Sequence, residues 1–180
     1  MKRTDSLARQ LTVSALCLTL CLVLPFLTGQ IKQIGNALCP MHLPVFLCAY
    51  LCGAPWAAAV GFVAPLLRFA LFQMPPVFPF GISMAFELAC YGLVSGLLYQ
   101  VLPGRMVRLY GSLLAAMAAG RIVWGTMRFL LAGLSGSEFS MAMFWAGAIF
   151  NAVPGILIQL ILVPAIVLGL ERAKLTALPQ

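Results

Sequence analysis

Charged residues are scarce in this sequence. Only 8% of the 180 residues are Asp, Glu, Lys or Arg, whereas 63% are hydrophobic and the mean hydropathy is +1.05. A soluble domain has about 25% charged residues, which cover its water-facing surface. A chain so poor in charge is excluded as a soluble globule. It is also excluded as a disordered chain, which needs the opposite composition. The composition therefore predicts an integral membrane protein.

Several kinds of catalytic and cofactor site are missing as well. A single histidine leaves no two-histidine metal site and no spare histidine for a Ser-His-Asp set. The sequence has no Gly-Lys-Ser/Thr phosphate loop and no Gly-x-Ser-x-Gly motif. We therefore expect no ATP hydrolysis by this chain alone, no cofactor and no bound metal. Aspartate is absent from the long apolar segments, which argues against a proton relay built on aspartate pairs.

The six cysteines form no Cys-x-x-Cys motif, and four of them make i,i+4 pairs in apolar segments. We interpret them as small apolar packing residues. A metal corner built on Cys39 and His42 is the alternative, but two ligands do not make a site.

Prolines, glycines and charges divide the chain into six apolar segments, interpreted as the transmembrane helices of one domain over residues 1–180. A spanning helix needs ~20 residues, so six use roughly 120 and leave no room for a soluble domain. The predicted spans are residues 7–28, 41–52, 56–72, 80–102, 109–131 and 141–170. The first is interpreted as a retained helix, because no small-x-small cleavage site follows it.

The basic residues predict the orientation, so the net charge of +7 is not interpreted as a nucleic-acid signal. With a cytoplasmic N-terminus, only Lys32 lies outside, and the inner segments hold Lys2, Arg3, Arg9, Arg105, Arg108, Arg172 and Lys174. An odd number of spans would place one basic cluster on the wrong side. The predicted fold is an all-α membrane protein of six helices, a compact bundle with both termini cytoplasmic, in the bacterial plasma membrane.

The candidate functional residues among the ionisable side chains of the predicted spans are Arg68, Glu87, Arg121 and Arg128. Placing a charged side chain inside the bilayer costs ~2.5–3.5 kcal/mol or more, so we interpret such a residue as functional by default. In the predicted topology Arg68, Glu87 and Arg128 lie in the outer half of the membrane, together with Asn151. Arg121 lies near the middle, as does Gln159. The polar groups therefore predict a pocket that opens to the outside.

Helical spacing groups some of these side chains. Arg121, Trp124 and Arg128 share one helix face, and Glu87 shares a face with Tyr91. Two guanidiniums and an indole suit a ligand that has a flat ring and a negative group. Alternatively, Glu87 pairs with one arginine as a structural link, or Arg68 snorkels outward. Three arginines against one glutamate leave a positive excess, which favours an anionic ligand or a partner's carboxylate.

Small residues four apart predict close helix contacts on several spans. The patterns are Gly92-x-x-x-Gly96, Ala116-x-x-x-Gly120 and Gly147-x-x-x-Asn151-x-x-x-Gly155. Ala15-x-x-x-Thr19 is a weaker pattern that either packs internally or faces a partner subunit. The polar loop from Gly29 to Pro40 is either a lid over the pocket or a plain connector.

Several stretches resemble the substrate-binding S-component of energy-coupling factor transporters. They are Leu38 to Cys48 (LCPMHLPVFLC), Cys52-Gly53-Ala54-Pro55, Gly61 to Leu67 (GFVAPLL), Met74-Pro75-Pro76 and Met84 to Gly92 (MAFELACYG). The resemblance covers nearly the whole chain and is densest between residues 37 and 96. Size, span number and orientation agree with it.

The resemblance implies a six-helix subunit that captures a vitamin or vitamin precursor from outside and associates with a transmembrane coupling protein and two ATPases. Family pockets draw on the first outer loop and on spans four to six. The first helix of the family often carries an Ala-x-x-x-Ala contact for the coupling protein, and here the corresponding pair is Ala15 and Thr19. This family pattern matches Glu87, Tyr91, Arg121, Trp124, Arg128 and Asn151, and the predicted substrate-binding residues are these six together with Arg68 and His42.

Two functions are therefore considered. The first is capture of a vitamin-type solute, with a carboxylate-bearing compound such as pantothenate or a pterin or biotin relative favoured by the arginine excess. The second is a small intramembrane enzyme or channel-like protein that uses Glu87 and His42 as its acid and base.

Overall fold

The computed structural model describes residues 2–27, 40–74, 76–136, 140–147 and 153–172, in which all regular structure is helical. The elements are α1 (Lys2–Leu27), α3 (His42–Cys52), α4 (Ala54–Phe72), the π-helical turn η1 (Val77–Gly81), α5 (Ile82–Val101), α6 (Arg105–Ser135), α7 (Met141–Trp145) and α8 (Val153–Arg172). The prediction of an all-α fold is confirmed for this part of the chain.

Five of these helical stretches are long and apolar enough to cross a membrane: Leu7–Phe26, Ala54–Phe72, Val77–Val101, Arg105–Ser135 and Val153–Arg172. Helix α3 is apolar but has only 11 residues. Its length is about 16 Å, compared with a hydrocarbon core of about 30 Å. The interpretation as a membrane protein is supported, whereas the count of six spans stays a prediction.

Two predicted segments differ from the helices observed. The segment 141–170 was predicted as one helix, but the described residues form a five-residue α7 and a separate α8 that begins at Val153. Pro154 lies in the first turn of α8, where its missing N–H costs nothing. Helix α6 is longer than the predicted 109–131. It lies between Gly104 and Gly136, which cap its two ends and both have positive φ.

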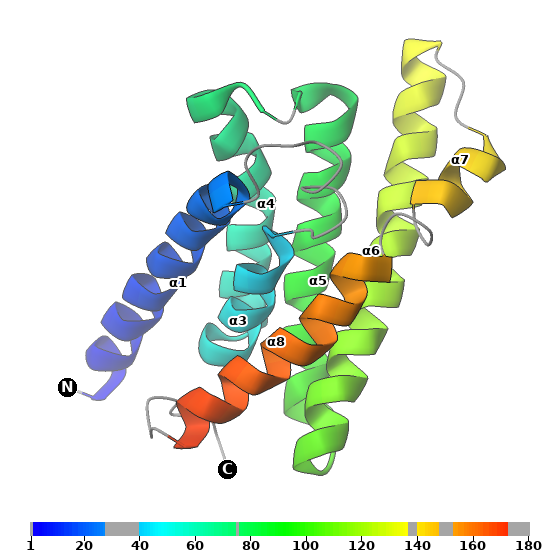
Figure 1. The fold of residues 1–180 in the computed structure, drawn as a ribbon. Helices are drawn as coiled ribbons and strands as arrows, with labels where there is room; N and C mark the ends of the chain where they lie inside the picture. Colours follow the sequence, from blue (N-terminus) through cyan, green and yellow to red (C-terminus); the bar gives the residue numbers. More distant parts are fainter. Residues whose placement is uncertain (1, 28–39, 75, 137–139, 148–152, 173–180) are drawn as a thin grey trace.

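When the short α3 is included, the helices α1, α3, α4, α5, α6 and α8 run in alternating directions, as expected of a membrane bundle (Figure 1). Three features lie at the same end of the molecule: the start of α1, the end of α8 and the turn between α5 and α6. These segments carry Arg9, Arg105, Arg108 and Arg172, so we call this the basic end. The cytoplasmic location of the basic end stays a prediction.

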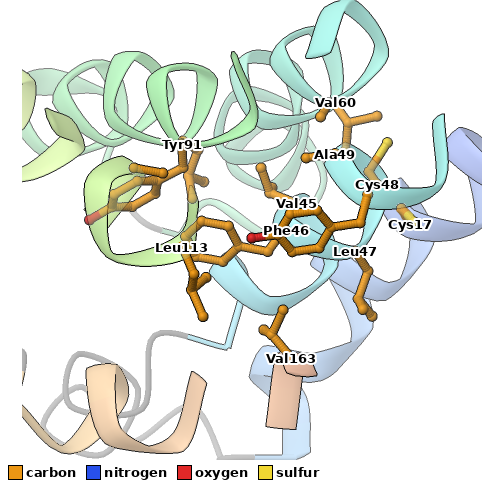
Figure 2. Packing of buried hydrophobic residues seen from close by; sticks show 14 of the residues in the cluster. Cys17, Val45, Phe46, Leu47, Cys48, Ala49, Val60, Tyr91, Leu113 and Val163 are labelled. Atoms are coloured by element: carbon orange, nitrogen blue, oxygen red, sulfur yellow. The ribbon is translucent and has the colours of Figure 1, made fainter. Parts of the chain in front are cut away.

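Helix α3 is the centre of the core. Nine of its 11 residues are buried, and it packs against α1, α4, α5 and α8. Figure 2 shows its side chains among those of the surrounding helices, including Cys17, Val60, Tyr91, Leu113 and Val163. The short helix is thus surrounded on nearly every side.

Thiols fill the contact between α1 and α3. Cys17, Cys21, Cys48 and Cys52 are free and buried in the core cluster. The Cys48 Sγ atom lies 3.6 Å from the Ser14 hydroxyl. This arrangement supports their interpretation as packing residues, while Cys39 lies outside the described residues.

Glycines bring α4 and α5 into backbone contact. A Cβ atom at Gly92 would lie 2.5 Å from the Ala57 carbonyl carbon, and one at Gly96 would lie 2.6 Å from the Ala54 Cα atom. Gly61 meets the Leu88 carbonyl in the same way. The close approach predicted from Gly92-x-x-x-Gly96 is therefore confirmed, and only glycine permits it.

A polar network that the sequence analysis did not predict joins helices at the basic end. The Arg105 side chain forms an ion pair with Glu171, whose other carboxylate oxygen accepts a 3.3 Å hydrogen bond from the Tyr99 hydroxyl. The ring of Tyr99 lies 4.7 Å from that of Tyr50. These contacts connect α3, α5, α6 and α8.

Candidate functional site

One carboxylate oxygen of Glu87 gathers three side chains from different helices. The Tyr91 hydroxyl donates a 2.8 Å hydrogen bond to Glu87 Oε1, and Arg121 Nη1 lies 3.1 Å from the same atom. The His42 Nε2 atom lies 3.6 Å from it. We call His42, Glu87, Tyr91 and Arg121 the Glu87 cluster. The structure thus brings four of the predicted site residues together.

Local sequence explains how the three helices meet at this point. Glu87 and Tyr91 are one helical turn apart on α5, so the hydroxyl reaches the carboxylate directly. His42 is the first residue of α3, and its ring lies 5.1 Å from that of Tyr91. Gly120 on α6 lies against the Tyr91 ring, where a Cβ atom would overlap it. This glycine brings the following residue, Arg121, next to Glu87.

Exposure divides the Glu87 cluster into a hidden and an accessible part. The side chains of His42 and Glu87 are each 3% exposed, whereas that of Arg121 is 17% exposed. Both ring nitrogens of His42 are buried and have no hydrogen-bond partner among the described residues. In the ion pair between Glu87 and Arg121, the arginine is therefore the side chain that a ligand could reach, and Glu87 lies behind it.

Arg121, Trp124 and Arg128 lie on one side of α6, and we call them the arginine face. The Trp124 ring stacks on that of Phe144 from α7, with 6.4 Å between centroids and 29° between planes. The Arg128 Cζ atom lies 4.2 Å from the centroid of the Phe80 ring in η1. The face therefore combines two cations with aromatic rings from two further elements.

Glycines again make this contact possible. A Cβ atom at Gly125 would overlap the Phe144 ring, and one at Gly147 would lie 2.5 Å from the Trp124 ring. The aromatic side chains of α6 and α7 therefore each occupy the space beside a glycine of the other segment. This reciprocal packing positions the indole on the arginine face.

Arg68 lies in a different part of the fold. It is buried on α4, and its Nη1 atom donates a 2.7 Å hydrogen bond to the Leu22 carbonyl of α1. Its Cζ atom lies 5.1 Å from the Phe26 ring centroid and 5.6 Å from that of Phe72. The described contacts of Arg68 thus join α1 to α4 and do not place it with the Glu87 cluster.

The remaining predicted residues are dispersed or not described. Asn151 and residues 29–39 of the predicted lid lie outside the described residues. Gln159 is buried on α8. Ala15 and Thr19 are exposed on α1, and the Thr19 hydroxyl donates to the Ala15 carbonyl at 2.9 Å. Both residues therefore lie on a surface that lipid or a partner can reach.

The aromatic partners Phe80 and Phe144 were not predicted, because single phenylalanines in an apolar chain carry no distinguishing signal. Tyr99 of the basic end does carry a signal, because it continues a regular spacing of polar residues along α5. Glu87, Tyr91, Ser95 and Tyr99 follow one another at four-residue intervals, and all four are buried. That spacing predicts one polar face along α5. No three His, Cys, Asp or Glu residues of the described chain could hold a metal together.

The comparisons with known proteins agree with this structure. A family model described as ECF transporter, substrate-specific component, matches residues 9–167. Comparison with curated proteins and with solved structures found no match. The family match covers α3 to α7 and most of α1 and α8, so it includes every helix that contributes to the Glu87 cluster and the arginine face. The resemblance noted in the sequence is thereby confirmed, and the chain belongs to the family of ECF transporter substrate-specific components.

Proposed function

We propose that this chain captures an anionic vitamin or vitamin precursor outside the cell and passes it to separate coupling and ATPase subunits. Family membership supports the role of a membrane substrate-binding subunit. The observation that supports an anionic ligand is the accessible Arg121. This arginine pairs with the buried Glu87 and lies on the same face of α6 as Trp124 and Arg128. In the predicted orientation this face lies toward the outside, away from the basic end.

The arginine face has the chemistry to hold a carboxylate and a flat ring. A guanidinium binds a carboxylate through two parallel hydrogen bonds and stacks on aromatic faces. Arg121 and Arg128 are seven residues apart, or about 10 Å along the helix axis. An elongated anion could therefore contact both arginines and stack on Trp124 between them. His42, Tyr91 and Asn151 are further candidate residues of the site. Arg68 is left out of the proposed site, because its described contacts join α1 to α4.

The rival hypothesis, an enzyme or channel that uses Glu87 and His42, has one observation in its favour. The two side chains do lie together, with 3.6 Å between Nε2 and Oε1. However, both are almost fully buried, and the same oxygen also meets Tyr91 and Arg121. An acid or base in this position is poorly accessible to a substrate. Capture by the accessible arginine fits the geometry better.

Purification of the chain without partners separates the two functions. We expect a small carboxylate-bearing compound to copurify with the detergent-solubilised protein and to be identified by native mass spectrometry. The isolated chain should bind that compound tightly but neither transport it into vesicles nor convert it. A neutral or cationic copurifying compound contradicts the anionic ligand, and chemical turnover by the isolated chain would support the rival.

The partner contact is proposed on α1, at Ala15 and Thr19. Both side chains are small and exposed, and the Thr19 hydroxyl is satisfied by its own helix. A helix of the coupling protein could therefore approach the α1 backbone closely without burying an unpaired polar group.

Replacement of Ala15 with leucine tests this contact. We expect Ala15→Leu to keep the ligand affinity within about twofold but to reduce ATP-driven uptake tenfold or more, because the larger side chain separates the two helices. Uptake into vesicles that contain the complete transporter measures the effect. Ala118→Leu is the control, because Ala118 is similarly exposed but lies on α6. Equal uptake by the Ala15→Leu variant and the wild type would rule out this contact.

A further inference from the structure

The charges of the Glu87 cluster balance without His42. Glu87 and Arg121 already neutralise each other at 3.1 Å. His42 approaches the same Glu87 oxygen, yet neither of its buried ring nitrogens has a hydrogen-bond partner among the described residues. A buried polar atom without a partner is costly, so this arrangement needs an explanation.

A proton on His42 would meet a carboxylate that Arg121 already compensates. His42 is the first residue of α3, where the helix dipole disfavours a positive charge. The arginine already compensates Glu87, and a second cation in the same buried space would be left without a counter-charge.

The other helices around His42 supply no competing acid. Facing it on α5 are Glu87 and Tyr91, and on α6 the charged neighbour is Arg121. Helix α1 places Cys21 nearby, with its thiol on the Met41 carbonyl. The one charged residue of α4 is Arg68, which binds α1 instead. The charged residues of α8, Glu171 and Arg172, lie at the basic end. Glu87 is therefore the one carboxylate of the described chain that can balance a proton on His42.

An anion on Arg121 changes this balance. The ligand's carboxylate then shares or replaces Glu87 as the partner of the guanidinium, and two negative groups face one cation. A buried carboxylate without its partner is strongly unfavourable. We propose that the site binds an anion together with one proton, which is taken from the solvent and held by His42 against Glu87. Each ligand charge of −1 is then matched by the +1 of that proton.

This inference rests on the proposed function and adds to it the identity of a second bound species. Because a proton is taken up with the anion, the complex is favoured at low pH. Where the free protein lacks this proton and the complex holds it, the dissociation constant should rise by up to about tenfold for each pH unit. This response requires a side chain that exchanges a proton near physiological pH, and histidine is the ordinary side chain of that kind.

Calorimetry measures the proton directly. Pantothenate, biotin and folate serve as anionic probes, and the probe that binds is titrated at pH 7 in phosphate and in Tris, whose ionisation enthalpies differ. We expect one proton taken up per ligand by the wild type and none by His42→Gln, whose affinity should also be independent of pH. Binding without proton uptake by the wild type would overturn this inference and leave the anion site intact. A protein that binds none of the probes but copurifies with a neutral compound contradicts the anion site and this inference with it.

A second experiment needs no ligand and uses the single histidine of the chain. Nuclear magnetic resonance of ring-¹⁵N-labelled histidine reports its protonation in detergent micelles. We expect a neutral ring in the wild type at pH 7, a protonated ring in Arg121→Gln, and a neutral ring again in the double variant Arg121→Gln/Glu87→Gln. If the His42 ring stays neutral in folded Arg121→Gln, the proposal that His42 takes up a proton when Glu87 loses its arginine is contradicted.

Discussion

Replacing Arg121 with methionine raises the ligand dissociation constant at least 100-fold. The change removes the accessible cation of the Glu87 cluster and leaves the buried carboxylate of Glu87 without its 3.1 Å partner. Loss of the protein's partner in a desolvated charge pair with a ligand costs about 2–5 kcal/mol of binding free energy, and a 100-fold change in the dissociation constant corresponds to about 2.7 kcal/mol. Calorimetric titration with the copurified ligand measures the affinity.

Two further variants separate binding from folding. Arg121→Met/Glu87→Met removes the unpaired charge as well as the cation, so we expect the thermal stability to recover while the ligand still fails to bind. Arg68→Met is the matched control, since Arg68 is also a buried intramembrane arginine but binds the Leu22 carbonyl of α1. It should lower the thermal stability and keep the affinity within about threefold. Wild-type affinity in folded Arg121→Met would remove Arg121 from the binding site.

Replacing Gly92 with alanine lowers the free energy of unfolding by about 3 kcal/mol. The added Cβ atom would lie 2.5 Å from the Ala57 carbonyl carbon, so α4 and α5 have to separate. Overpacking of a rigid core costs about 1–3 kcal/mol, and the upper end applies here because a backbone cannot rotate away as a side chain can. Equilibrium unfolding in mixed micelles, followed by circular dichroism, measures the loss.

Gly169→Ala is the matched control for this change. Gly169 lies inside α8, and a Cβ atom there would meet nothing within 4 Å. This substitution should be neutral or stabilising by up to about 1 kcal/mol, because alanine favours the helix over glycine. If the two substitutions have equal effects, the close approach of α4 and α5 does not contribute to the stability.

Composition and spacing were enough to predict the class of fold and part of the site. An 8% content of charged residues allows no water-facing surface, so the membrane follows without any knowledge of the structure. The i,i+3 and i,i+7 relations of Arg121, Trp124 and Arg128 follow from the helical repeat, and so does the pairing of Tyr91 with Glu87. Gly92 and Gly96 marked a close helix contact, because glycine has no side chain to hold a neighbouring backbone away.

The partners of these faces came from the tertiary structure alone. Spacing along α5 and α6 predicts which side chains share a face, but it does not predict that Arg121 turns toward Glu87 while Arg68 turns toward α1. It also does not predict that the start of α3 brings His42 to the same oxygen. The physical reason lies in the bilayer. Lipid tails and the contacts between helices are equally apolar, so hydropathy does not distinguish the lipid-facing side of a helix from its packed side. The close fit between helices decides how each one is rotated about its axis.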